Sequence, residues 1–140
     1  MMFFIKIIAL LPFPLLYLLA DILGFVARDI LKYRRSVVNQ NLKNAFPEKT
    51  PRERDTISRR FYTQLADVVV ESVKTLGLSE RAMAERVKIM DTEDARNFFK
   101  ENSSVIALTG HSGNWEWILS ACALHLGCRV DAVYQQLSSP

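Results

Sequence analysis

Residues 105–127 read VIALTGHSGNWEWILSACALHLG. The stretch starts with a continuous apolar run, residues 105–108, passes through a turn with two glycines, and continues as a second apolar segment that ends at Gly127. A short apolar run of this kind is typical of a strand covered on both faces of a parallel sheet. The segment from Trp115 to Gly127 is typical of a buried helix with a glycine stop. We therefore expect a strand, a turn and a helix in this order.

Similar patterns lie on both sides of this stretch. Residues 87–90 and 129–134 are plausible short strands, and Asp91 or Thr92 can cap a helix that runs through Phe99. Strand, helix and strand with short links imply a right-handed crossover, and ligands of open parallel sheets gather at the carboxyl ends of strands. We expect an α/β fold that holds the first βαβ units of a mainly parallel sheet. The sheet is expected to be incomplete, because the chain ends just after a strand.

A helical layer is predicted before these units. A short helical pattern starts at Val37 and ends at Phe46-Pro47, and Thr50-Pro51-Arg52-Glu53 is a capping box with proline in the first turn. The apolar stripe behind the box is predicted to be a core face that runs to Gly77; it contains Ile57, Phe61, Leu65, Val68, Val69, Val73 and Leu76. Ser79 can cap a further short helix that runs through Val87.

The N-terminal segment is apolar, and Lys6 is its only charged residue up to Ala20. Pro12 and Pro14 interrupt it, so the better helix is expected to start near Pro14. Its apolar residues follow helical spacing: Leu15, Leu18, Leu19, Ile22, Leu23, Val26 and Ile30. A basic cluster follows at the end of the stripe: Arg28, Lys32, Arg34 and Arg35.

Charge is distributed unevenly along the 140 residues, although 18 basic and 15 acidic side chains nearly cancel. Residues 25–60 carry ten basic and four acidic side chains, and residues 61–140 carry seven and ten. The composition excludes a wholly disordered chain and a collagen-like one, and two cysteines exclude a disulfide scaffold.

We divide the chain into a membrane-associated helix with a basic end, residues 1–35, and the N-terminal part of one domain, residues 36–140.

Three interpretations of residues 1–35 compete, besides a buried core helix. A cleaved secretory signal is disfavoured, because there is no basic leader beyond Lys6 and no clear cleavage site. A single membrane-crossing anchor remains open. An amphipathic or kinked helix in one leaflet, with its basic end against anionic headgroups, is favoured. The arginines at 52, 54, 59 and 60 form a solvated face or help to hold anionic lipid. The basic excess after the apolar segment places the body in the cytoplasm.

His111 and Glu116 are the candidate catalytic pair. Five residues of regular helix place two side chains about 140° apart, so they can pair only if His111 precedes the helix and Glu116 lies in its first turns. A carboxylate bonded to one ring nitrogen fixes the imidazole tautomer, and the other nitrogen can then take a proton from an alcohol. Amides near Gly113 point out of the helix N-terminus, where a phosphate or a developing oxyanion is favoured.

Other interpretations of these residues are weaker. Residues 110–113 lack the second glycine of a serine-hydrolase elbow. Cys122, His125 and Cys128 are spaced like zinc ligands, but a fourth ligand is absent, so core packing is favoured and no metal site is predicted. A purely structural role for His111 stays open on spacing alone.

The block Gly110-His111-Ser112-Gly113-Asn114-Trp115-Glu116 resembles the His-x4-Asp/Glu motif of the bacterial lipid A biosynthesis (late) acyltransferases, in the lysophospholipid acyltransferase superfamily. Residues 34–48, RRSVVNQNLKNAFPE, are similar to a second segment of that family. The resemblance covers essentially the whole chain but only the N-terminal half of a usual member. It implies the glycerolphosphate-acyltransferase-like sheet expected above.

The resemblance also implies an activity. A fatty acyl group would move from an acyl carrier protein or coenzyme A thioester to a hydroxyl of a lipid acceptor in lipopolysaccharide biosynthesis. His111 would be the general base and Glu116 its orienting carboxylate, while the residues Ser112, Gly113, Asn114 and Trp115 would shape the acceptor pocket. No metal or resident cofactor and no nucleic-acid partner would be needed. The expected location is the cytoplasmic face of the bacterial inner membrane.

One position departs from the family pattern. Tyr134, Gln135 and Gln136 are candidate substrate-binding residues and stand where many members carry an arginine or lysine. Glutamine at this place puts phosphate recognition there in doubt and leaves open a branch of the family with a different acceptor. Two other functions remain open. The first is an inactive membrane-attached binding fragment that lacks the donor-binding half. The second is a lipid hydrolase in which His111 and Glu116 act on water, which fits the apolar leader poorly.

Overall fold

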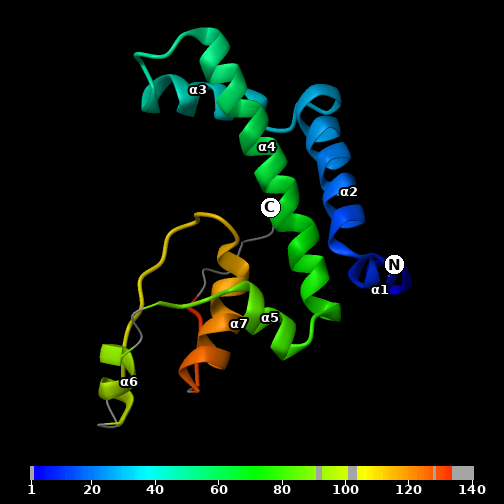
Figure 1. Cartoon of the computed structure of the whole chain (residues 1–140). Coiled ribbons are helices and arrows are strands. Elements are labelled where there is room, and N and C mark those ends of the chain that lie inside the picture. The colour runs from blue at the N-terminus through cyan, green and yellow to red at the C-terminus, as the bar shows by residue number, and fades with distance from the viewer. Residues whose placement is uncertain (1, 91–92, 101–103, 128, 134–140) are drawn as a thin grey trace. The chain divides into compact units, whose positions relative to one another are not determined.

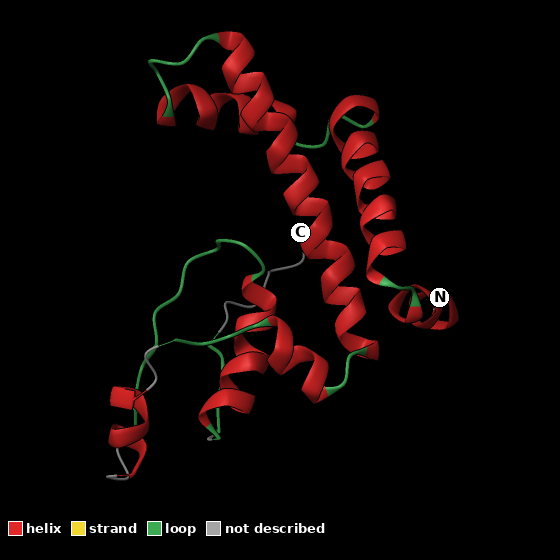
Figure 2. Cartoon of the chain, in the orientation of Figure 1, coloured by secondary structure: helices red, strands yellow, loops and turns green. Residues whose placement is uncertain are grey.

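The structure is a computed structural model that describes residues 2–90, 93–100, 104–127 and 129–133. The chain forms two compact units, residues 1–77 and residues 78–140, and each is described by itself. Figure 1 follows the chain by residue number, and Figure 2 shows that the described elements are helices joined by loops.

In its described residues, 2–77, the first unit contains four α-helices and two short helical turns. Helix α1 is Met2–Leu10 and α2 is Phe13–Phe25, which continues as a π-helical turn, η1, Val26–Ile30. Helix α3 is Arg35–Ala45, α4 is Pro51–Lys74, and a 3₁₀ turn, η2, is Thr75–Gly77. The break between α1 and α2 confirms the effect expected of the two prolines.

Helix α4 begins as its sequence predicts. The Thr50 hydroxyl accepts a hydrogen bond from the Glu53 amide at 3.3 Å, and the Glu53 carboxylate accepts one from the Thr50 amide at 2.8 Å. The predicted capping box is therefore confirmed. Because two orphan amides are satisfied at once, this end of the helix is well defined.

Helices α2 and α4 run antiparallel and pack closely. Leu16, Ala20 and Gly24 on α2 are buried, and a Cβ added at Gly24 would lie 3.0 Å from the Tyr62 carbonyl oxygen of α4. Residues four apart form the contacting row on each helix, which is the commonest way in which helices interdigitate. Small residues at these positions let the two backbones approach.

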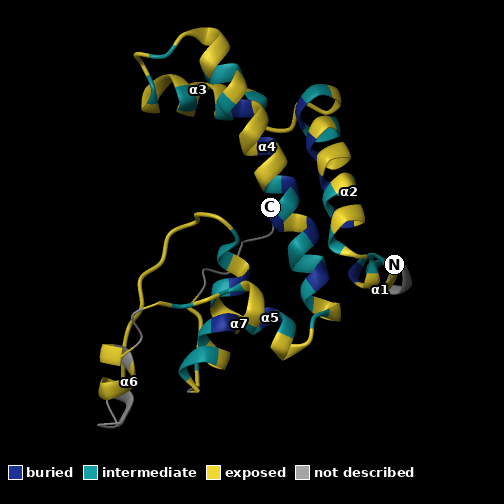
Figure 3. Cartoon of the chain, viewed as in Figure 1, coloured by how far each residue is buried: buried dark blue, intermediate teal, exposed yellow. Residues whose placement is uncertain are grey.

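The buried face of α4 differs from the predicted stripe. The buried row, in which every fourth residue is buried, holds Ser58, Tyr62, Ala66, Val70 and Lys74, whereas only Val68 of the predicted set is buried. Phe61, Val69 and Leu76 are exposed. The prediction was wrong because it ranked residues by hydrophobicity, while close packing against Gly24 and Ala20 selects by size and shape. Figure 3 shows exposed residues along both helices.

Lys74 joins the end of α4 to the end of α1. Its side chain is 9% exposed, and its ammonium donates hydrogen bonds of 2.8 Å to the carbonyl oxygens of Ala9 and Leu11. The ammonium also lies 5.3 Å from the centre of the Phe13 ring. A cation at the carbonyl end of a helix is favourable, and here it satisfies carbonyls that α1 leaves unpaired.

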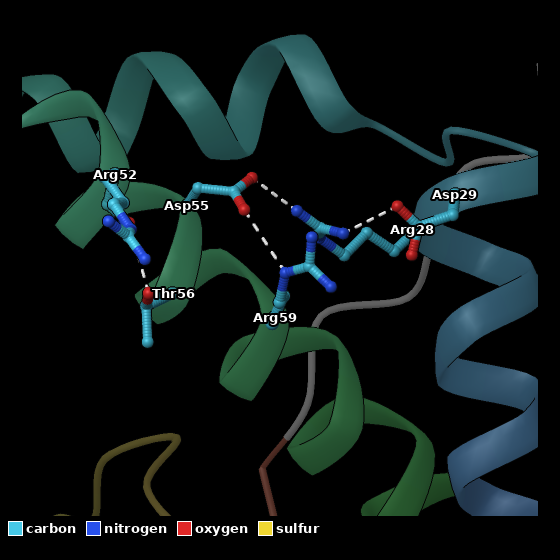
Figure 4. Close-up of polar contacts among 6 residues, drawn as sticks. All are labelled: Arg28, Asp29, Arg52, Asp55, Thr56 and Arg59. Carbon is cyan, nitrogen blue, oxygen red and sulfur yellow. Dashed lines mark hydrogen bonds and ion pairs between the residues drawn. The ribbon is translucent and has the colours of Figure 1, made fainter.

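An ion-pair network joins η1 to α4 near the start of that helix. Arg28 is 3% exposed and pairs with Asp29 at 2.6 Å and with Asp55, and Arg59 donates to Asp55 at 3.2 Å (Figure 4). Burial disfavours the charged guanidinium, but the two carboxylates outweigh it, so the pKa of Arg28 is raised. Arg28 is therefore an internal residue and is not part of the cationic surface expected from its sequence neighbours.

The second unit contains three helices among its described residues: α5, Glu80–Arg86; α6, Glu93–Lys100; and α7, Trp115–Leu126. The Ser79 hydroxyl accepts a hydrogen bond from the Ala82 amide, as predicted. Gly127 ends α7 with a φ of 65°, a left-handed conformation that favours glycine. Helix α5 packs against α7, and Met83, Trp117 and Ala121 are buried. Asp91 and Thr92 lie outside the described residues.

The predicted α/β fold is wrong for the described part of the chain, which contains no strand and no sheet. Residues 87–90, 105–108 and 129–133 are extended or irregular, and Ile106 and Leu108 are 90% and 95% exposed. Apolar character alone does not make a strand, because a buried parallel strand needs hydrogen-bonded neighbours and helices on both faces. The position of the candidate site around His111 therefore cannot be explained by the carboxyl end of a strand.

Candidate active site

The candidate site lies in the turn before α7. Gly113 has a φ of 60°, which an L side chain rarely adopts, and the Ser112 amide donates to the Gly110 carbonyl oxygen at 2.9 Å. Asn114 then caps the helix, because its side-chain oxygen accepts a hydrogen bond from the Trp117 amide at 3.2 Å. The prediction that glycine supplies backbone freedom in this turn is confirmed at Gly113.

The structure places His111 in this turn and Glu116 in the first turn of α7, the arrangement that their five-residue spacing requires. Both side chains are exposed, so an external group can reach the imidazole. A carboxylate in the first helical turn is favoured by the helix dipole, and the amides of that turn face outward. The residues predicted to act as the general base, its carboxylate and the oxyanion-binding turn thus lie within six positions of the chain, 111–116.

The two catalytic candidates do not bond to each other in the described residues. Instead, the Glu116 carboxylate accepts a hydrogen bond of 3.0 Å from the Trp115 indole N–H. The His111 ring packs on the same indole, with 4.9 Å between ring centres and 60° between ring planes. Trp115 therefore contacts both members of the proposed pair.

Sequence reasoning assigned Trp115 only to the wall of an acceptor pocket and missed this connecting position. A signal was present, because an indole N–H is a donor that needs an acceptor and a carboxylate follows it in sequence. Ser112, Gly113 and Asn114 lie in the turn as expected. Tyr134, Gln135 and Gln136 lie outside the described residues, so their predicted role in substrate binding stays a prediction.

His125 is engaged elsewhere in the second unit. Its Nε2 atom lies 2.5 Å from the Val87 carbonyl oxygen, and its own carbonyl oxygen accepts a hydrogen bond from Arg96 at 2.9 Å. Cys128 lies outside the described residues. No group of three or more metal-ligating side chains occurs in the part of the chain that the structure describes.

Comparison with known proteins matches the chain to a protein family. Residues 1–137 match the family model described as bacterial lipid A biosynthesis acyltransferase. The chain is 34% identical over 62 residues to a lipid A biosynthesis palmitoleoyltransferase of Escherichia coli (strain K12), and equally to a lipid A biosynthesis acyltransferase of Shigella flexneri. These matches span 44% of this chain and 20% of each relative. No solved structure matches significantly.

Proposed function

The chain belongs to the bacterial lipid A biosynthesis acyltransferases, and from this membership we propose that it takes part in acyl transfer from a thioester to a hydroxyl of a lipid acceptor. The observation that carries the proposal is the exposed His111 in the turn before α7, with Glu116 in the first turn of that helix. An acyltransferase of this kind needs a base for the hydroxyl and a site for an oxyanion. Residues 111–116 supply both.

The reaction follows from these residues. An imidazole nitrogen of His111 takes the proton of the acceptor hydroxyl, while the oxygen of that hydroxyl attacks the thioester carbonyl carbon. The oxyanion that forms is favoured at the outward-facing amides of the first turn of α7. When the intermediate collapses, the carbon–sulfur bond breaks, and the imidazolium returns its proton to the departing thiolate. Glu116 stabilises the imidazolium by its charge.

The partners of this reaction are an acyl donor and a lipid acceptor. We propose an acyl carrier protein or coenzyme A thioester as co-substrate, with no resident cofactor. The hydroxyl acceptor is proposed to be a lipid A precursor, by analogy with the names of the matching family and relatives. Asn114 and Trp115, in the turn and at the start of α7, would border the acceptor.

The proposed location is the cytoplasmic face of the inner membrane. Among the described residues, no helix is both long and apolar enough to cross a bilayer. Support for contact with one leaflet comes from α2, which exposes Leu15, Leu18, Ile22 and Phe25 on the side opposite its buried row. These residues recur at intervals of three and four, so they lie along one stripe of the helix. Basic residues follow directly after it.

Acyl transfer from a labelled thioester to lipid acceptors tests the proposal. The protein that carries residues 1–140 is expected to form acylated lipid. His111→Ala should lower that rate by about 10²- to 10⁴-fold. His125→Gln is the matched control, because His125 contacts the Val87 carbonyl oxygen and not the turn.

Two results would count against the proposal. If His111→Ala keeps the wild-type rate, His111 is not the base. If free fatty acid appears and acylated lipid never does, the residues act on water, and the hydrolase interpretation replaces the transferase.

A further inference from the structure

Trp115 occupies a position between the two proposed catalytic side chains. Its indole ring packs against the His111 ring, and its indole N–H holds the Glu116 carboxylate at 3.0 Å. Consecutive residues of a helix point about 100° apart and do not normally face each other. Glu116 must therefore turn back along the helix to reach the indole.

One carboxylate thus has two competing partners. In the described part of the chain, His111 has no carboxylate within ion-pair distance, while Glu116 is occupied by a neutral N–H donor. The indole N–H donates to a charged carboxylate without itself being charged, whereas a bond from imidazolium to Glu116 would join opposite charges and add their Coulomb attraction. Neutral imidazole competes weakly with the indole N–H for Glu116, but imidazolium competes strongly. The partner of Glu116 is therefore sensitive to the charge of the His111 ring.

We propose that Trp115 is a positioning residue whose indole N–H holds Glu116 away from neutral His111 and releases it to the imidazolium. This inference rests on the proposed function, in which His111 takes up a proton from the acceptor hydroxyl. While the base is unprotonated, Glu116 remains on Trp115 and does not favour premature protonation. When the base receives the proton, Glu116 moves to it and stabilises the new charge.

Indole N–H signals in NMR spectra test this directly, because the chain has only two tryptophans, Trp115 and Trp117. Trp115→Phe removes one signal and so assigns both. The Trp115 signal of the wild type is expected to move when the pH is lowered far enough to protonate an imidazole. Glu116→Gln and His111→Ala should each abolish this movement. Trp117, which is buried, is the internal reference and should stay in place.

A matched control addresses the other histidine. His125→Gln removes the only other imidazole, and the Trp115 signal should still move with pH in this variant. A Trp115 signal that stays fixed in the wild type overturns the proposal. A signal that moves equally in His111→Ala, or only when His125 is present, also overturns it.

A kinetic measurement separates this inference from the proposed function. Trp115→Phe keeps an aromatic ring beside His111 but lacks the N–H donor, so Glu116 is free to hold the imidazolium at all times. The acid side of the pH–rate profile of this variant should shift upward by roughly 0.2–0.7 pH units, the worth of one exposed ion pair, whatever the change in its maximal rate. An unshifted profile overturns the inference. Loss of transfer activity in His111→Ala concerns the proposed base alone, whereas the indole signals require no activity.

Discussion

Asp67 is a residue whose negatively charged carboxylate is disfavoured in the folded protein. It lies on α4, one helical turn before Glu71. Burial raises the pKa of Asp67, and the nearby charges of Glu71 and Asp21 raise it further. A carboxyl whose folded-state pKa is above its unfolded value binds protons more tightly when folded. Asp67 therefore costs stability at neutral pH, and this cost disappears as the pH falls through its folded-state pKa.

Asp67→Asn should accordingly raise the free energy of unfolding at pH 7. The expected gain is about 0.2–0.5 kcal/mol, the usual cost of a like-charge pair four residues apart on a helix. Thermal unfolding at pH 7 and at pH 3 measures it. The gain should be present at pH 7 and absent at pH 3. An equal gain at both values would show that packing, and not charge, is responsible.

Local signals were the most predictable features at the scale of single residues. The caps at Thr50 and Ser79 and the stop at Gly127 depend on neighbours within four positions, so the sequence contains all the partners. The bond between Trp115 and Glu116 depends on which of several side-chain rotamers is adopted. Spacing predicted where His111 and Glu116 lie along the chain but did not predict which group Glu116 contacts.

Lys74 and Gly77 determine how α1 meets the end of α4. Lys74 supplies two hydrogen bonds to α1, and a Cβ added at Gly77 would lie 2.7 Å from the Ala9 carbonyl oxygen. Lys74→Met keeps much of the side-chain volume but leaves these carbonyls without a donor, so it should destabilise the unit by about 1–3 kcal/mol. Gly77→Ala should loosen the same contact by overpacking, at a cost of similar size.

Denaturant unfolding and hydrogen exchange of the α1 amides measure both effects. Lys43→Met, which removes an exposed lysine of α3, is the control and should change stability by less than about 0.5 kcal/mol. If Lys74→Met and Lys43→Met are equally stable, the hydrogen bonds to α1 contribute nothing net.

The existence of the helices was easier to predict than their buried faces. Periodicity identified α2 and α4, but both helices carry apolar residues on more than one side. The buried row of α4 includes Ser58 and Lys74, which a hydrophobicity pattern assigns to solvent. The prediction of strands was wrong for a related reason. Residues 105–108 would need neighbouring strands and covering helices to form a strand, and no local sequence pattern specifies them.

Across the whole molecule, the first unit combines an exposed apolar stripe with nearby positive charge. The stripe of Leu15, Leu18, Ile22 and Phe25 lies opposite the buried row of α2, and exposed Lys32 and Arg34 follow it along the chain. Apolar side chains gain free energy on leaving water, and each cation near an anionic bilayer contributes about 1 kcal/mol. Both features favour the same partner, a leaflet that contains anionic lipid.

Vesicle binding tests this association independently of acyl transfer. Replacement of both Leu18 and Ile22 by serine should weaken binding at least about tenfold, because each side chain gives up roughly 1 kcal/mol or more of transfer free energy. The same change should leave the free energy of unfolding nearly unaltered in the absence of lipid, because both residues are more than half exposed. Replacement of Lys32 and Arg34 by glutamine should weaken binding to anionic vesicles and not to neutral ones.

Leu16 provides the matched contrast on the same helix. It is completely buried against the rest of the unit, so Leu16→Ala should cost about 2–5 kcal/mol of stability. Its folded form should nevertheless bind vesicles as the wild type does, because the outward stripe is intact. If Leu16→Ala weakens binding under conditions where it is folded, and the double serine variant does not, then the outward face of α2 is not the surface that meets the bilayer. If the double serine variant weakens binding and folded Leu16→Ala does not, then the inward side of α2 packs in the protein core and its outward side contacts the lipid leaflet.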